Sequence, residues 1–193
     1  WNGFKYKPDY GGSASPEVVE ELERHIADAE VSGRVKHMSL AEATRSGLVE
    51  DFDPQGSYLR HIATLVDLEA IRGAGLKVAV DPMFGAGAGY LAEMVSGGRT
   101  EVVEIRGERN PAFPGMAQPE PLAHNLEPLA SAVAAESADV GLATDGDSDR
   151  LGVMDARGGF VTTLQTFALL CLHHLEVLGR RGALVRSITM TSM

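Results

Sequence analysis

Three aspartates in one short run are the side chains of this sequence best suited to chemistry. Asp145, Asp147 and Asp149 stand at alternate positions and are followed by Arg150. Apolar segments lead into and out of the run, which predicts a loop at the end of a buried strand. Two full charges about 4 Å apart repel by roughly 4 kcal/mol at an effective dielectric near 20, and one arginine offsets only part of this. A cation is therefore expected, and carboxylate oxygens favour Mg²⁺ or Ca²⁺.

Two other kinds of aspartate site share part of this pattern. An EF-hand loop needs Gly at its sixth position and Glu at its twelfth. The corresponding residues here are Arg150 and Ala156, so the EF-hand is excluded. A metal-dependent phosphatase of the DxD type normally carries its Asp pair after the first strand of the fold. The run here comes late in the chain and continues into a third aspartate, so this phosphatase is a lower-ranked alternative.

A glycine-rich segment at residues 85–89 offers a second possible site. It follows a strand-like segment that ends at Asp81. A dinucleotide-binding fingerprint has Gly at its first, third and sixth positions. Gly85 and Gly87 fit, but the sixth position is Tyr90. The match is partial, so we prefer a tight strand-to-helix turn and keep a non-catalytic nucleotide- or anion-binding α/β module as an alternative.

The elements that must position the aspartate run alternate between strand and helix. Strands are expected at 76–81, 100–105 and 140–144, with a short helix to about residue 96 and a second helix capped by Asn125. This order predicts an α/β fold, specifically a three-layer α/β/α domain with a largely parallel sheet. Ligands of such sheets bind beyond the carboxyl ends of the strands, where the aspartate run lies. The Pro-rich loop at 110–121 is long enough that we expect it to cover or order something.

The flanking sequences predict elements that belong to partial neighbouring domains. Helices are expected at 16–29, at 57–73 with Ser57 as the cap, and at 164–178, and a strand is expected at 183–190. Turn-like residues near position 55 and at 155–159 mark the boundaries. We expect residues 1–55 to be the C-terminal remnant of one domain, 56–158 a complete α/β/α domain, and 159–193 the start of a third.

Composition narrows the range of partners. The 193 residues carry a net charge of −10 and show no basic run, which argues against nucleic acid. No apolar run reaches the length of a membrane span. Cys171 is the single cysteine, so no intramolecular disulfide can form, which fits a cytoplasmic protein. The chain opens on Trp1 and ends at Met193 straight after a strand-like segment, so we expect a fragment of a longer protein.

The aspartate run with its arginine resembles the metal-binding loop of the α-D-phosphohexomutases, the phosphoglucomutase and phosphomannomutase family. Three further stretches agree with that family in order and spacing. Residues 1–5, with Gly11 and Gly12, resemble the segment after the family's catalytic serine. Residues 80–87 resemble the glycine turn that opens the second of its four domains, and residues 186–189 resemble the beginning of the third.

This resemblance implies a function and a role for each candidate residue. In the family, a serine gives a phosphoryl group to a hexose phosphate, and a bisphosphorylated sugar forms and returns its other phosphate. By matched position, Asp145, Asp147 and Asp149 would bind Mg²⁺ together with the phosphoserine, and Arg150 would hold phosphate charge. Lys5, whose default interpretation is a surface charge, would be a general acid or base.

The resemblance also implies what this chain lacks. The Ser-His-Asn-Pro run that carries the nucleophile would end just before Trp1, and the sugar-recognition loop would lie beyond Met193. The partners are then a hexose phosphate, such as glucose 1-phosphate or mannose 1-phosphate, and the remaining domains of the parent chain. We expect the 193-residue chain to be inactive alone and to bind Mg²⁺ weakly.

Overall fold

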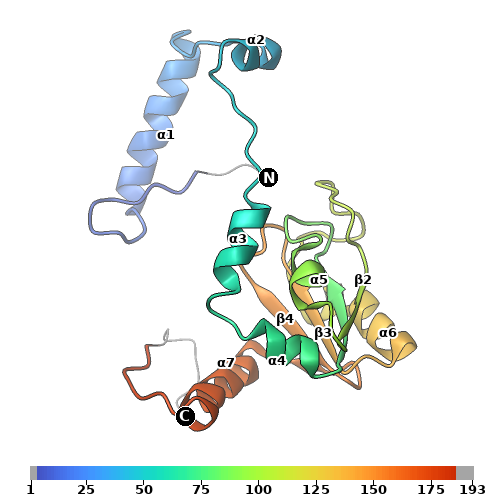
Figure 1. Cartoon of the computed structure of the whole chain (residues 1–193). Coiled ribbons are helices and arrows are strands. Elements are labelled where there is room, and N and C mark those ends of the chain that lie inside the picture. Colours follow the sequence, from blue (N-terminus) through green and yellow to red (C-terminus); the bar gives the residue numbers. More distant parts are fainter. Residues whose placement is uncertain (1–3, 186–193) are drawn as a thin grey trace. The chain divides into compact units, whose positions relative to one another are not determined.

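The chain divides into two units, Trp1–Asp53 and Pro54–Met193, in a computed structural model that describes residues 4–185. The first unit holds α1 (Pro16–Val31) and α2 (Leu40–Arg45) (Figure 1). The helix expected at 16–29 is confirmed, with Pro16 in its first turn, where a missing N–H is tolerated. Neither helix contains a buried residue.

The second unit is built on a five-stranded sheet with the order β2-β1-β3-β4-β5. The strands are β1 (Lys77–Asp81), β2 (Glu101–Glu104), β3 (Val140–Thr144), β4 (Leu151–Asp155) and β5 (Phe160–Val161). β1 pairs in parallel with β2 and β3, whereas β4 is antiparallel to both β3 and β5. Four of these five strands therefore point the same way, which confirms a largely parallel sheet.

Helices cover both faces of this sheet. The helical elements of the second unit are α3 (Gln55–Ile62), α4 (Leu68–Gly73), α5 (Tyr90–Val95), η1 (Ala123–Asn125), α6 (Glu127–Glu136), α7 (Thr163–Leu172) and the π-helical turn η2 (His173–Val177). α6 packs against β1 and β3, and α5 packs against β2, α3 and α4. Figure 1 shows α6 on one side of the strands and α4 and α5 on the other, as two right-handed crossovers in opposite directions require.

The core follows from this layering. Ala79 and Ala143 share one apolar cluster with Leu129 and Val133 of α6. Val80, next to Ala79 along β1, points to the opposite face because neighbouring side chains alternate in a strand, and it is buried there as well. Burial on both faces is why residues 78–80 form a continuous apolar run, which ends at Asp81.

Four local predictions differ from the structure. The helix expected at 57–73 is two helices, because Asp67 begins α4 by accepting the Ala70 N–H at 2.9 Å. Ser57 lies inside α3 instead of capping it. Asn125 belongs to η1, and Leu126 occupies the N-cap position of α6. Residues 183–185 of the expected final strand are irregular, and 186–190 lie outside the described residues.

The apolar helix expected at 164–178 is confirmed as α7 and η2. Thr162 and Gln165 form a capping box at its start. Leu169, Leu170 and Leu172 are each more than half exposed. Within residues 4–185, no helix combines the length and the apolar character that crossing a membrane requires.

Candidate metal centre

The aspartate run closes the hairpin between β3 and β4. The two strands stay paired up to Thr144 and Leu151, so residues 145–150 form the loop. Asp145, Asp147 and Asp149 each offer a carboxylate oxygen, and these atoms all lie within 4.8 Å of one another. The three aspartates that the sequence singled out are therefore brought together at one hairpin tip.

Asp145 is the buried member of this group, with no exposed surface. Its Oδ1 accepts the backbone N–H of Arg150 at 2.9 Å, and its Oδ2 accepts the Arg150 Nε–H at 2.7 Å. Burial raises the pKa of this carboxyl, but the hydrogen bonds and charge of Arg150 outweigh burial and hold the pKa below its usual range. Asp145 is therefore ionised near neutral pH.

Arg150 joins residues 145–150, called the metal loop below after the cation they are expected to bind, to the Pro-rich loop at 110–121. Its Nη1 lies 2.9 Å from a carboxylate oxygen of Glu120, and its Nε lies 3.5 Å from Asp149. Hydrogen bonds to Glu120 and then to Asp145 raise its pKa further above the usual arginine value. About half of the side chain remains exposed, so the guanidinium is held but still accessible from solvent.

The donor set suits a hard divalent cation. All three side chains offer carboxylate oxygens, which Mg²⁺ and Ca²⁺ prefer to nitrogen or sulfur. Each oxygen of Asp145 carries two lone pairs and accepts one hydrogen bond from Arg150. A lone pair on each oxygen thus remains for a metal, and the residues present fit a metal of this class.

The glycine-rich segment supports the metal loop. A Cβ at Gly85 would lie 2.7 Å from the Gly146 carbonyl oxygen, and one at Gly87 would lie 2.5 Å from Ser148 Oγ. Between them, Ala86 N–H donates to the same Gly146 carbonyl at 3.0 Å. Both glycines allow two loops to approach closely, which explains their spacing without a nucleotide.

The Pro-rich loop contacts the metal loop from another side. The N–H of Gly146 donates to the Pro119 carbonyl at 3.0 Å. A Cβ at Gly146 would come within 2.7 Å of Pro119 and 3.2 Å of Phe113. The long loop therefore covers another segment, the metal loop, and whether it orders that loop stays a prediction.

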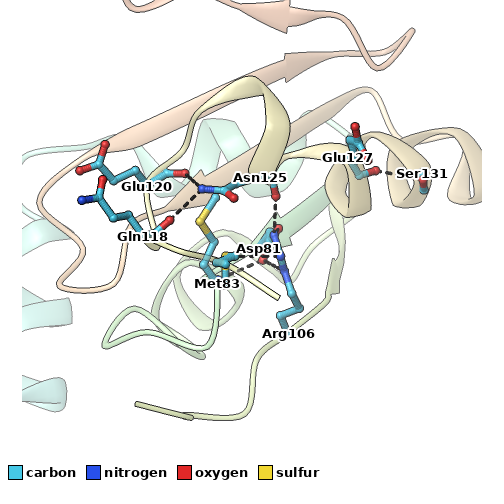
Figure 2. Close-up of polar contacts among 9 residues, drawn as sticks. Asp81, Met83, Arg106, Gln118, Glu120, Asn125, Glu127 and Ser131 are labelled. Carbon is cyan, nitrogen blue, oxygen red and sulfur yellow. Dashed lines mark hydrogen bonds and ion pairs between the residues drawn. The ribbon is translucent and has the colours of Figure 1, made fainter. Parts of the chain in front are cut away.

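A buried network that sequence reasoning missed anchors these loops to the sheet (Figure 2). Arg106 donates to both carboxylate oxygens of Asp81, which is fully buried at the end of β1. The same guanidinium donates to the Asn125 carbonyl at 3.0 Å. One signal was available in the sequence, since Asp81 is a charged residue that ends an apolar strand and so requires a partner.

A cavity of about 550 Å³ lies beside the metal loop. Polar residues of the loop line one side, namely Asp147, Ser148, Asp149 and Arg150, and the rest is mainly apolar, with Tyr58, Tyr90, Leu91 and Met94. The rings of Tyr58 and Tyr90 meet edge to face, with centroids 5.8 Å apart. The outer carboxylates therefore face an open space.

Lys5 belongs to the first unit and is exposed there. Its role stays a prediction. Trp1, Asn2 and Gly3, which carry part of the resemblance on which that prediction depends, lie outside the described residues, as do residues 186–189.

Comparisons with known proteins agree on one family. The family model for phosphoglucomutase/phosphomannomutase, alpha/beta/alpha domain II, matches residues 56–159. A phosphoglucosamine mutase from Thermobifida fusca is 33% identical over 178 residues, which make up 91% of this chain and 36% of that protein. A phosphoglucomutase from Neisseria meningitidis serogroup A is 30% identical over 161 residues, which make up 83% of this chain and 32% of that protein.

The fold agrees as well. A solved structure from Thermus thermophilus, assigned as a phosphomannomutase, aligns with a TM-score of 0.60 and 33% identity over 66% of this chain and 30% of that chain. The chain spans about a third of the length of the curated relatives it matches. Because the domain II model covers more than half of the sequence and the relatives and fold agree with it, the chain belongs to the phosphoglucomutase/phosphomannomutase family, the α-D-phosphohexomutases.

Proposed function

We propose that the chain supplies the metal-binding domain of a phosphohexomutase, an isomerase that moves a phosphoryl group between C1 and C6 of a hexose. The observation that carries the proposal is the group of three aspartates, whose ligand atoms lie within 4.8 Å of one another at a strand end. The relatives bear three different sugar names, phosphoglucosamine, phosphoglucose and phosphomannose. The proposal therefore extends to the hexose phosphate class and to no single sugar.

In this proposal Asp145, Asp147 and Asp149 hold Mg²⁺. The metal, when bound, would polarise the phosphoryl group. Arg150 keeps Asp145 ionised and correctly oriented, and its half-exposed guanidinium offers charge-assisted hydrogen bonds to phosphate oxygens. Phosphoryl transfer depends mainly on positioning and on stabilising charge at those oxygens. Three carboxylates held close together beside an arginine can do both once a metal is bound.

Lys5 is the proposed general acid or base for a sugar hydroxyl. Its amine must be in the neutral form to accept a proton from that hydroxyl. The phosphorylated serine would come from the part of the parent protein before Trp1. These two roles rest on the family resemblance, and the metal loop is the part supported by described side chains.

We also propose that residues 1–55 complete the first domain of the parent, 56–158 form its second domain, and 159–193 begin its third. The exposed apolar side chains support this arrangement. Ile26 on α1 and Leu169 and Leu172 on α7 are each 56 to 59% exposed, and leaving large apolar groups in water is costly. The coverage of about a third of each relative supports it as well.

Magnesium titration of the 193-residue chain tests the metal assignment. The amide NMR signals of residues 145–150 are followed for the wild type and for Asp147→Ala. We expect saturable, weak binding by the wild type and none by the variant, with both proteins folded. If the two proteins gave equal titration curves, the assignment of Mg²⁺ to these aspartates would be wrong.

An activity assay tests the reaction class. We expect no conversion of glucose 1-phosphate to glucose 6-phosphate by the isolated chain, because the serine belongs to another part of the parent. Conversion by the purified chain would contradict the proposal that the catalytic serine lies in another part of the parent protein. Release of inorganic phosphate would instead favour the phosphatase alternative.

A further inference from the structure

We propose that Asn125 is a positioning residue that holds the metal loop in its ligand-binding shape, acting through residues 118–120. The inference rests on the proposed function for the part that concerns Mg²⁺. The sequence pattern predicts only a helix cap at this position, whereas the structure places the side chain in the network that supports the metal loop.

Asn125 is almost fully buried, with 6% of its surface exposed. Its amide nitrogen donates to the Gln118 carbonyl at 2.8 Å and to the Glu120 carbonyl at 2.9 Å (Figure 2). Both N–H groups of the side chain are thus used on one short piece of irregular backbone. A buried amide with both protons engaged has a fixed orientation.

The backbone of Asn125 is itself anchored to the sheet. Its carbonyl accepts a hydrogen bond from Arg106, whose guanidinium also grips Asp81 at the end of β1. The following residue, Leu126, is fully buried in the core. Asn125 therefore holds residues 118–120 in a fixed position relative to the sheet.

Residues 118–120 reach the metal loop at two points. The Pro119 carbonyl accepts the N–H of Gly146, which lies between the ligands Asp145 and Asp147. The Glu120 carboxylate lies 2.9 Å from the Arg150 guanidinium, which in turn holds Asp145. The segment fixed by Asn125 thus restrains both ends of the loop.

The three carboxylates need such restraint because they repel one another. Without it the loop gains conformations in which the carboxylates are further apart, and binding then includes the cost of bringing them back together. Outer-shell partners of metal ligands typically contribute roughly 10- to 100-fold to metal affinity. Asn125 lies further out, since Arg150 and Glu120 stand between it and Asp145, so we expect the lower end of that range.

The test compares Asn125→Ala with Thr100→Val in the 193-residue chain. Thr100 is 3% exposed and donates to the Ile71 carbonyl at 2.6 Å, near the amino end of β2. Its loss weakens the same domain from the end of the sheet opposite to the metal loop. Stability from urea unfolding and Mg²⁺ affinity from amide NMR are measured for both variants and for the wild type.

We expect Asn125→Ala to weaken Mg²⁺ binding about 10-fold, while Thr100→Val binds as the wild type does. Equal losses of affinity in the two variants would mean that Asn125 acts through general stability, and the inference would be wrong. Unchanged affinity in Asn125→Ala would overturn it too.

Glu120→Gln is the second variant, because a partly exposed side chain can change without unfolding the domain. It keeps an acceptor for Arg150 and loses the charge. If Asn125 acts through residues 118–120, the double variant loses less affinity than the product of the two single losses. If the affinity loss of the double variant equalled the product of the two single losses, Asn125 would not act through residues 118–120.

Amide hydrogen exchange without metal separates the inference from the proposed function. We expect Asn125→Ala to speed exchange of the Gly146 N–H about 10-fold or more relative to Thr100→Val. If the wild type fails to bind Mg²⁺, the metal assignment fails, and this exchange rate still decides whether Asn125 holds the loop. Equal exchange rates would overturn the inference.

Discussion

Arg150 donates to both carboxylate oxygens of Asp145, through its backbone N–H at 2.9 Å and its Nε–H at 2.7 Å. The two residues are the first and last of the hairpin loop between β3 and β4, so this pair closes the loop. Asp147 and Asp149 lie between them and are exposed. The three aspartates therefore differ in what they contribute to folding.

Replacing the inner and outer aspartates should separate stability from metal binding. Asp145→Ala removes a charged acceptor from Arg150 and should cost about 1.5–3 kcal/mol of unfolding free energy. Asp147→Ala removes an exposed side chain and should change stability by less than about 0.5 kcal/mol. Both variants should lose Mg²⁺ binding, as urea unfolding and NMR titration can show. If both variants lost the same unfolding free energy, the inference that buried Asp145 contributes more to stability than exposed Asp147 would be wrong.

Gly85→Ala should disturb the metal loop by direct contact. The new methyl group would lie 2.7 Å from the Gly146 carbonyl oxygen and 2.9 Å from the Pro82 carbonyl oxygen, and backbone atoms cannot rotate away. We expect a loss of about 1–3 kcal/mol and shifted amide signals across residues 145–150. The control is Gly73→Ala, where nothing lies within 4 Å of the added carbon, and we expect no loss there.

Arg106→Met should be among the most damaging single changes in the domain. It leaves the fully buried carboxylate of Asp81 without its cation, and breaking such a pair costs about 3–5 kcal/mol. Lys77→Met breaks the more exposed pair of Lys77 and Glu136 and should cost much less. Urea unfolding of the two variants gives the comparison, and a similar cost for both would contradict the role of burial.

The unfolding free energy should decrease at acidic pH, in part because the Asp155 carboxyl becomes protonated. Hydrogen bonds from the Gly159 N–H and then the Arg157 N–H lower the pKa of this carboxyl. Because the folded pKa lies below the unfolded value of about 3.9, the ionised group stabilises the fold above that pH. This contribution disappears as the pH falls through the folded pKa. Asp155→Asn keeps an acceptor but cannot titrate.

The measurement for Asp155 is the unfolding free energy of wild type and Asp155→Asn across a pH series. The difference between the two proteins should stay constant from about pH 7 to pH 5 and should shrink below about pH 4. A constant difference down to about pH 2 would mean that the carboxyl does not titrate differently in the two states.

The local pattern of apolar and polar residues predicted most of the strands and helices of the second unit. The strands at 77–81, 101–104 and 140–144 each have a short run of apolar residues between turns, which the sequence pattern makes recognisable. The aspartates meet because alternate positions in a tight loop cannot diverge far. The role of the metal loop itself stays a prediction.

The supporting residues depend on contacts between distant parts of the sequence. Asp81 and Arg106 are 25 positions apart, and Arg150 reaches Glu120 across 30. No periodicity marks such pairs, and an Asn before a helix suggests a cap in any sequence. The single helix expected at 57–73 was wrong because its apolar spacing continues through Asp67, whose side chain starts a new helix.

The peptide units around Gly146 join three loops, since its N–H donates to Pro119 and its carbonyl accepts from Ala86. A cation that binds the aspartates on either side therefore binds an assembly that exists only when the whole second unit is folded. Its binding free energy must then appear as heat resistance of the entire unit. At 100 times Kd the gain is about 2.7 kcal/mol, and a rise in melting temperature with Mg²⁺ that disappears in Asp147→Ala would measure it.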